Sequence, residues 1–383
     1  MTSSMRFSSS TSPAVGDRRV TGRSLLLTLH LALLALAAGC GSEQTTTLAP
    51  ADSNRFAAHA VGTDTTLELV TWNLRNFASD AGSDEVALVA EAIAGLGADV
   101  VALQEVESTV VLDDLSVRIG TLTTGAVVYD VYLTPGNDRG EINNGYLVNP
   151  ARVAVDGVTQ IDAAACLSSD NTPLHDRPSQ ELQARFIAEG QDWPFVVINN
   201  HLRSLGGIDT ARTRLKRHEQ SQSIAARIQA LQSGDPTLPV VVTGDLNAFQ
   251  FSDGYVDVVG LLSGTSVEDA NLVNIENSGV PGFDPTNQVD PTLIKPIESL
   301  PTGERYSFIF QGNSQALDHA LISQSAQPFL VGFSYSRGNA DVWENFETDS
   351  GNALRSADHD GLIVVLDPAG IPDAVFSDRF EGS

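Results

Sequence analysis

The chain contains a series of short apolar runs that each end in a cluster of polar residues. The runs are rich in Val, Ile and Leu and are roughly six to eight residues long, which is typical of strands buried in a sheet. In chain order they are LELVTWNL, DVVALQEV, FVVINNHL, PVVVTGDL, QALDHALI and DGLIVVL. Such runs are not lone surface strands, so the pattern predicts a layered domain of mixed α and β structure.

Ionisable and amide side chains lie at the ends of these runs. They are Asn73, Glu105, His201, Asp245, Asn247, Asp318, Asp358 and His359. An isolated buried charge costs several kcal/mol, so charged groups on buried strands pair with each other or bind a ligand. Together they are the groups needed to hold one hard cation and to hydrolyse a phosphate ester.

Each of these residues alone has a structural explanation. Asn73 fits a turn at a strand end, His201 fits a hydrogen-bonded core histidine, and Asp245 with Asn247 fits an Asx turn. The pair Asp358 and His359 fits a surface turn before the last strand. A working site is favoured because all of these clusters occur in one chain.

The order and wording of the clusters resemble the endonuclease/exonuclease/phosphatase superfamily, which includes the deoxyribonuclease I-like enzymes. The resemblance rests on TWNLRNF, LQEVES, NNHLRS, TGDLNAF, LDHALIS and ADHDGLIVV, and it spans about residues 67 to 367. The stretches YSFIFQGNSQALDHALIS, RGNADVWEN and RSADHDG are most similar to bacterial secreted nucleases. The resemblance implies an α+β fold, a four-layer αββα sandwich of two mainly antiparallel sheets flanked by helices.

The resemblance also implies a metal site. Asn73 and Glu105 match the positions that bind the divalent ion, and Asp358 is a further carboxylate nearby. Mg²⁺ is the expected ion, with Mn²⁺ or Ca²⁺ as alternatives. A Mg²⁺ held by one or two carboxylates and an amide oxygen keeps several waters and stabilises charge on the nonbridging phosphate oxygens.

The remaining positions match the catalytic groups of the family. Asp245 matches the residue that orients or deprotonates the attacking water, and Asn247 the one that donates to a phosphoryl oxygen. His201 matches a histidine held by a carboxylate, with Asp318 as its partner, and His359 lies opposite the phosphate. A carboxylate beside His201 would favour the imidazolium, which suits donation of a proton to the leaving oxygen.

The candidate substrate-binding residues are Arg75, Asn143 and Arg203. The N-x-R spacing places Arg75 on the same strand face as Asn73, within reach of a phosphate. GNDRGEINNGYL resembles a superfamily stretch in which residues near Asn143 approach the phosphate. Glu107 stands where deoxyribonuclease I-like enzymes carry a groove-contacting arginine, so we do not expect their mode of minor-groove binding.

The charge balance argues against tight nucleic-acid binding. The chain has 48 acidic and 22 basic residues and a formal charge of −26, the opposite of a basic nucleic-acid footprint. However, basic residues gather in the predicted helix 209–232, which begins shortly after His201 and Arg203. The start of this helix either lies over a phosphate backbone or is an ordinary solvated face.

The N-terminus predicts export. Arginines precede SLLLTLHLALLALAAGC, which ends in small residues and is too short for a comfortable transmembrane helix. LAAGC resembles a lipoprotein box with Cys40 as the lipidated residue, and cleavage after Ala37 by an ordinary signal peptidase is the alternative. Cys166 is the only other cysteine, so an acylated Cys40 leaves no disulfide. The protein is thus expected at the cell surface or outer membrane, or secreted or periplasmic.

The chain divides into four predicted segments. They are an export signal at 1–40, a flexible tether at 41–66, the catalytic domain at 67–367 and a tail at 368–383. Within the domain, SDEVALVAEAIAGLG has helical apolar spacing and predicts the helix between the first two strands. The stretch 251–303 is rich in Asp, Asn, Pro and Gly, which predicts a long loop near the site.

Three functions are compatible with these features. The first is a monomeric, metal-dependent nuclease that hydrolyses DNA, and RNA as an alternative substrate, with little sequence preference. The second is a phosphatase or phospholipase C-type enzyme acting on phospholipid head groups or inositol phosphates. An exposed aromatic hairpin would favour a lipid substrate, and the sequence shows none clearly. The third, a noncatalytic surface binding protein, is disfavoured because every core position of the site is filled.

Overall fold

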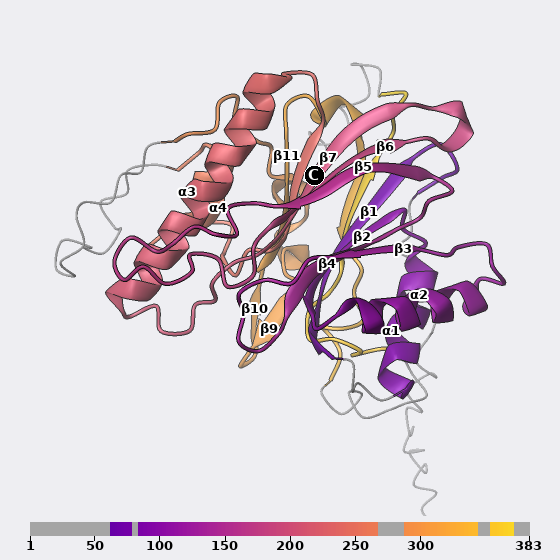
Figure 1. The fold of residues 1–383 in the computed structure, drawn as a ribbon, viewed down its shortest axis with the longest axis horizontal. Helices are drawn as coiled ribbons and strands as arrows, with labels where there is room; N and C mark the ends of the chain where they lie inside the picture. The colour runs from indigo at the N-terminus through magenta and orange to yellow at the C-terminus, as the bar shows by residue number, and fades with distance from the viewer. Residues whose placement is uncertain (1–61, 79–82, 267–286, 344–352, 371–383) are drawn as a thin grey trace, which may run out of the picture. The chain divides into compact units, whose positions relative to one another are not determined.

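A computed structural model describes residues 62–78, 83–266, 287–343 and 353–370 of the chain. The six apolar runs all form strands, as predicted. The strands build two main sheets, with helices on their outer sides (Figure 1). The predicted α+β fold, a four-layer αββα sandwich, is therefore confirmed.

The first sheet has six strands in the order β12-β13-β1-β2-β4-β3. The strands are β1 (Leu67–Phe77), β2 (Val100–Val106), β3 (Asp130–Leu133), β4 (Asn143–Val148), β12 (Leu330–Tyr335) and β13 (Leu362–Leu366). All neighbouring pairs are antiparallel except β1 and β2, which are parallel. Parallel neighbours need a crossover connection, and here helix α1 supplies it.

The second sheet has five strands in the order β11-β8-β7-β6-β5. The strands are β5 (Val153–Gln160), β6 (Gln180–Phe186), β7 (Trp193–His201), β8 (Val240–Asp245) and β11 (Asp318–Ile322). Only β7 and β8 are parallel, and helix α3 crosses between them. Both sheets are thus mainly antiparallel, with one parallel pair each.

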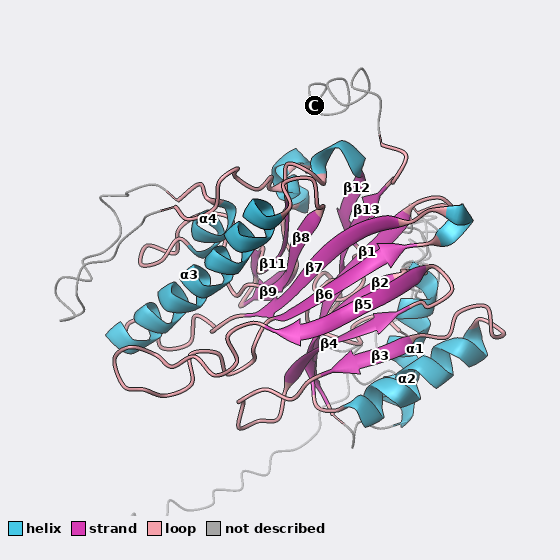
Figure 2. Ribbon diagram, turned by 45° about the horizontal axis from the view of Figure 1, so that its top comes forward, coloured by secondary structure: helices cyan, strands magenta, loops and turns pink. Residues whose placement is uncertain are grey.

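Helices α1 and α2 lie on one side of the strands, and α3 and α4 lie on the other (Figure 2). The α-helices are α1 (Ser83–Leu96), α2 (Thr109–Leu122), α3 (Ala211–Gly234) and α4 (Val258–Ser263). Short 3₁₀ helices span Ala188–Gly190, Pro296–Ser299, Thr302–Glu304 and Gln327–Phe329. The first helix was predicted correctly, and α3 follows the predicted helix at 209–232 closely.

Three apolar clusters hold the four layers together. In β1, Leu67 and Leu69 point into the cluster between the sheets, whereas Val70 and Trp72 point into the cluster under α1 and α2. The third cluster joins the second sheet to α3 and α4. Strand residues alternate between faces, so a strand apolar at every position must be covered on both sides. The continuous apolar runs thus match strands that are covered by helices on one face and by the second sheet on the other.

The stretch 251–303 is more ordered than predicted. It contains helix α4, whose Asp257 side chain accepts a hydrogen bond from Gly260 N and caps the helix. Asp257 is a good N-cap in a Gly- and Asp-rich stretch, a signal that the loop prediction overlooked. Residues 267–286 of this stretch lie outside the described residues.

A two-stranded hairpin stands apart from the main sheets. It consists of β9 (Phe308–Phe310) and β10 (Asn313–Gln315), and Phe310 at its end is 51% exposed. The sequence showed no clear aromatic hairpin, and the structure corrects this. The three-residue β9 was too short to stand out by alternation.

Several predicted segments lie outside the described residues. These are the export signal at 1–40, the tether at 41–66 up to residue 61, and the tail at 368–383 from residue 371 onward. Among the residues that are described, no helix is long and apolar enough to span a membrane.

Candidate active site

The register of three strands places three ionisable side chains in one row. In the parallel pair β7 and β8, His201 lies opposite Asp245. In the antiparallel pair β11 and β8, Asp318 lies opposite the same residue. Side chains at paired positions project from the same face. The row is therefore a direct product of strand pairing in the second sheet.

Only glycine can occupy position 244, directly before Asp245. Its φ is +123°, and a Cβ at this position would lie 2.1 Å from the carbonyl oxygen of Asn200 on β7. Neither the conformation nor the close approach is open to an L-residue with a side chain. The glycine of the GDLN motif thus allows β8 to approach β7 directly before Asp245.

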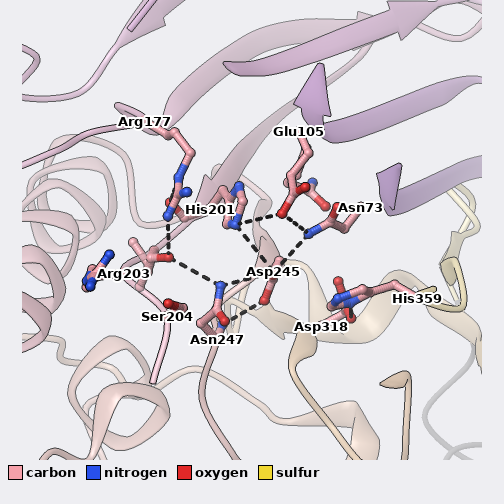
Figure 3. Close-up of polar contacts among 12 residues, drawn as sticks. Asn73, Glu105, Arg177, His201, Arg203, Ser204, Asp245, Asn247, Asp318 and His359 are labelled. Atoms are coloured by element: carbon pink, nitrogen blue, oxygen red, sulfur yellow. Dashed lines mark hydrogen bonds and ion pairs between the residues drawn. The ribbon is translucent and has the colours of Figure 1, made fainter. Parts of the chain in front are cut away.

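Asp245 is the centre of the site (Figure 3). Its Oδ2 accepts hydrogen bonds of 3.0 Å from the side-chain amides of Asn73 and Asn247, and its Oδ1 accepts from Asn247 N. Burial, and then the nearby Asp318 carboxylate, raise the pKa of Asp245 to about 7. An aspartate with this pKa can take up a proton near neutral pH.

His359 and Asp318 form a hydrogen-bonded pair. His359 Nδ1 donates to Asp318 Oδ2 at 2.6 Å, and both side chains are buried. Burial alone would lower the pKa of His359, but the charge and hydrogen bond of Asp318 outweigh it and raise this pKa to about 10. His359 is therefore an imidazolium at neutral pH, with Phe308 stacked on its ring at 4.6 Å between centroids.

The predicted pairing of His201 with Asp318 is wrong. His201 Nε2 instead lies 3.6 Å from Glu105 Oε1 and 3.5 Å from Asp245 Oδ2. Burial and the positive charges of Arg177 and His359 hold the pKa of His201 well below its usual range. His201 is neutral, so the proton that sequence reasoning gave to His201 belongs to His359. The two histidines cannot be assigned from spacing alone, because β8 separates His201 from Asp318 in the sheet.

Asn73 and Glu105 lie beside this row, at the ends of β1 and β2. Asn73 Nδ2 donates to Glu105 Oε1 at 3.2 Å, and Asn76 N donates to Glu105 Oε2 at 2.8 Å. Glu105 has a left-handed backbone with φ 60°, and Asn247 has φ 48°. Such conformations cost about 1 kcal/mol or more in non-glycine residues and cluster at functional sites.

The donor set fits a hard divalent ion. Glu105 supplies one partly exposed carboxylate and Asn73 an amide oxygen, which suits an ion that keeps several waters. Asp358, the third predicted ligand, forms a 3.8 Å ion pair with Arg75. Among the described residues, no group of three or more His, Cys, Asp or Glu side chains is arranged to hold a metal. The metal would thus rest on Glu105 and Asn73 rather than on a carboxylate cage.

Arg75 does not share a regular strand face with Asn73. The pairing of β1 with β2 shifts register between Asn73 and Phe77, and Arg75 and Asn76 both have positive φ. Arg75 N donates to Asn73 Oδ1, so the bulge orients the asparagine. The prediction assumed regular alternation, which a bulge interrupts. The guanidinium still lies at the site through its ion pair with Asp358.

Asn143 holds a loop in place. Its Oδ1 accepts from Gly136 N, and its Nδ2 donates to the carbonyl oxygens of Val106, Glu107 and Glu141. The side chain is buried and its hydrogen-bonding groups are all engaged. The structure therefore gives Asn143 a structural role in place of the predicted contact with substrate.

The basic residues of helix α3 are mostly bound to acidic partners. Their ion pairs are Arg212 with Asp170, Lys216 with Asp176, Arg217 with Asp253, and Arg227 with Glu181. Arg217 is fully buried at its side chain, so it belongs to the core rather than to a surface. The helix as a whole is therefore not a basic face, and Lys216 and Arg217 are buried in ion pairs rather than on the solvated face that was the stated alternative.

Arg177 and Arg203 flank the row on the His201 side. Arg177 donates to the carbonyl oxygens of His201 and Leu202, and Arg203 N is held by the Gln220 side chain. Figure 3 shows both arginines on one side of Asp245, with His359 and Asp318 on the other. Arg203 was predicted to bind substrate, whereas Arg177 was not among the predicted site residues.

Sequence reasoning missed the residues that fix the His359 loop. Arg337 donates to Asp360 Oδ2 at 2.8 Å, and Asp360 Oδ1 accepts from the backbone of Asn339 and Ala340. Ser307 Oγ accepts from Asp318 N and so anchors the start of β11. The available signal was the pair RGNA and DHDG, whose opposite charges fit a contact between two loops.

A sandwich of two sheets with an aspartate, an imidazolium and a carboxylate–amide pair at one edge defines a metal-dependent phosphoesterase. The sequence pattern of the Endonuclease/Exonuclease/phosphatase family matches residues 70–341. The chain therefore belongs to this family. Its members typically use a divalent metal ion.

The chain is similar to several solved structures. The catalytic domain of human Nocturnin, solved with a bound sulfate anion, matches with a TM-score of 0.52 and 15% identity, over 80% of this chain and 95% of that chain. Truncated Caenorhabditis elegans TDP2 matches with a TM-score of 0.49 and 15% identity, over 79% and 97%. A Bacteroides thetaiotaomicron mannosyl-6-phosphatase matches with a TM-score of 0.48 and 18% identity, over 78% and 98%. No curated protein matches the chain.

Proposed function

We propose that this protein is an exported, Mg²⁺-dependent phosphodiesterase that hydrolyses nucleic acid, with DNA as its first substrate. The observation that carries the proposal is Asp245 between neutral His201 on one side and the His359–Asp318 pair on the other. Hydrolysis of a diester needs a base for water and an acid for the alkoxide that leaves. The positive charge of Arg203 beside the row favours a substrate that carries further phosphates next to the scissile one.

The residues divide the chemistry among them. A divalent ion on Glu105 and Asn73 would stabilise charge on the nonbridging oxygens. Asp245 accepts a proton from the attacking water, whose oxygen bonds to phosphorus as the bond to the leaving oxygen breaks. His359 gives its proton to that leaving oxygen, and Asn247 donates to a phosphoryl oxygen. Asp318 keeps His359 charged and oriented in the ground state.

Plasmid nicking tests the proposal. The full chain is incubated with supercoiled DNA in Mg²⁺ or in EDTA, beside an Asp245→Asn variant. We expect nicking that needs Mg²⁺ and falls at least about 10³-fold in the variant, because the base is lost. If DNA and RNA both stay intact while circular dichroism shows that the protein is folded, the nuclease function is refuted.

A phospholipid head group is the second candidate substrate. The hairpin β9–β10 presents Phe310 to solvent, and Phe308 on the same strand stacks on His359. An exposed aromatic next to the acid of the site is suited to insertion into a lipid interface. Release of phosphocholine from sphingomyelin vesicles, lost in Phe310→Ser while a soluble diester is still hydrolysed, would establish this function in place of the first.

Export is part of the proposal. It is supported by the apolar segment that ends at LAAGC, with lipidation at Cys40 as the proposed anchor and secretion as the alternative. Labelling of cells with a radioactive fatty acid tests the anchor. A Cys40→Ser variant should lose the label and appear in the soluble fraction.

A further inference from the structure

A cavity whose charged lining residues are more often basic than acidic lies next to the active site. It has a volume of about 520 Å³, and its charged lining residues are Asp138, Arg139, Asp176, Arg203, Arg212 and Lys216. Four of these six residues are basic, whereas acidic residues outnumber basic ones 48 to 22 in the whole chain. The charge balance of this cavity beside the catalytic centre is thus the reverse of that of the whole chain.

Two of the four basic side chains have no acidic partner. Lys216 is paired with Asp176 and Arg212 with Asp170. Within the described part of the chain, Arg139 and Arg203 form no ion pair, and the only hydrogen bond of the Arg203 guanidinium is the one that it donates to the carbonyl oxygen of Gly206. Guanidinium groups that keep free N–H donors match the geometry of phosphate oxygens.

The turn that carries Arg139 is held in place. Asp138 Oδ1 accepts from Gly140 N, and the carbonyl oxygen of Asp138 accepts from Glu141 N. Asp138 also forms a 3.7 Å ion pair with Arg177. Arg139 is exposed at this turn, so its position is fixed by the backbone while its charge faces solvent and the cavity.

The cavity is connected directly to the catalytic row. Arg203 is two residues beyond His201, and Arg177 joins Asp138 at the cavity to the carbonyl oxygens of His201 and Leu202. Arg203 lies on the side of Asp245 opposite His359, the proton donor (Figure 3). When the leaving group of a phosphodiester faces His359, the other ester substituent of the phosphate therefore extends toward the cavity.

We propose that this cavity binds a second phosphate of the substrate, a backbone phosphate of the nucleic-acid strand next to the scissile one. Arg139 and Arg203 are the groups that bind it. The inference rests on the proposed nuclease function and adds to it a requirement for a polynucleotide. Diesters with a single phosphate would leave the cavity unused.

Binding and cleavage of a (dT)12 oligonucleotide test the proposal. The full chain is compared with Arg139→Gln and with a matched control, Arg118→Gln, which removes one positive charge from helix α2. We expect KM for (dT)12 to rise about fivefold in Arg139→Gln, as for loss of one exposed ionic contact. KM for bis(p-nitrophenyl) phosphate, which has a single phosphate, should stay unchanged, so the ratio of the two KM values should also rise about fivefold. The control Arg118→Gln should behave as wild type.

Salt dependence gives a second readout that needs no catalysis. Fluorescence anisotropy in EDTA measures binding of labelled (dT)12 between 50 and 200 mM salt, roughly the range over which phosphate contacts dominate. Loss of one phosphate contact should reduce the slope of log K against log salt by about 0.7 in Arg139→Gln. An unchanged slope and KM in this variant would overturn the proposal even if DNA is cleaved.

The two failures can be told apart. If the wild-type protein cleaves neither DNA nor RNA but binds (dT)12 with the Arg139-dependent slope, the nuclease function fails and the phosphate site stands. If Arg139→Gln instead weakens only the hydrolysis of inositol 1,4-bisphosphate, the second phosphate belongs to a small molecule and the nucleic-acid assignment is overturned.

Discussion

Two buried histidines lie on opposite sides of Asp245, and they differ in charge. His359 donates to Asp318 at 2.6 Å and has a pKa of about 10, whereas His201 lies 3.5 Å or more from its nearest carboxylates and has a pKa well below normal. Both are desolvated. The difference shows that a close, hydrogen-bonded carboxylate offsets the cost of burying an imidazolium, and that longer contacts do not.

Of the residues in this comparison, His359 should lower kcat the most when it is substituted. We expect His359→Gln to lower kcat by about 10³-fold, because general acid catalysis contributes between about 10² and 10⁴. The rate of hydrolysis of a nucleotide or diester with a good leaving group, such as a nitrophenolate, should fall less, because this leaving group needs no proton. Equal losses on good and poor leaving groups would contradict the assignment of His359 as the acid.

Substitution of its partner tests why His359 is charged. Asp318→Asn should lower kcat by about 10²-fold and move the alkaline limb of the pH profile to lower pH. The protonated form of His359 persists up to a pKa of about 10 and is lost above it, and removal of the Asp318 charge lowers that pKa. The profile of kcat/KM between pH 6 and pH 11 checks the direction. A limb that stays in place would show that another group titrates there.

Substitution of the neutral histidine should have a smaller effect. We expect His201→Gln to lower kcat about tenfold, because it removes contacts to Glu105 and Asp245 but no proton donor. The alkaline limb should stay where it is in the wild type. Loss of this limb in His201→Gln, but not in His359→Gln, would reverse the assignment of the two histidines.

A buried glutamate away from the site extends the comparison to stability. Burial, and then the nearby Asp99, raise the pKa of Glu68 from 4.5 to about 7, and its Oε1 has no hydrogen-bond partner among the residues that the structure describes. Glu68 is more easily buried when it is neutral. Its favourable contribution to the free energy of unfolding is therefore fully present below pH 4.5 and is lost as the pH rises through about 7. Glu68→Gln should therefore be more stable than wild type by about 1–3 kcal/mol at pH 8 and nearly equal to it at pH 4.

Urea unfolding at the two pH values measures this difference. Arg152, which donates to Asp99 and to the carbonyl oxygen of Thr66, is unchanged in the variant. A variant that is less stable than wild type at pH 8 would show that the charged Glu68 interacts favourably in the folded protein.

The strands were predictable because they follow from local pattern, whereas the four-layer sandwich and the roles of the site residues were expected from the family resemblance. Continuous apolar runs required cover on both faces, and the GDLN motif with its glycine marked the centre of the site. What failed depends on contacts between distant segments. Asp318 pairs with His359 because β11 and the loop after residue 353 meet at the site, and no spacing along the chain reveals that meeting.

The other errors came from local irregularity and from charge counting. The bulge after Asn73 turned Arg75 out of the expected alternation, and no residue there signals a bulge. The basic residues of α3 were counted without their partners, since Asp170, Asp176 and Asp253 lie in other segments. Asn143 was assigned by resemblance, which does not distinguish a residue that contacts substrate from one that holds a loop.

The row of His201, Asp245 and Asp318 has a consequence for how this protein can diversify. These residues belong to rungs of one sheet, and a slip of one residue in any strand would turn its side chain to the opposite face. The turn with Arg139 and the hairpin with Phe310 lie in connections between strands of the main sheets, where changes in length are tolerated. Selection can therefore change the two segments that we propose to contact substrate while the catalytic row is kept.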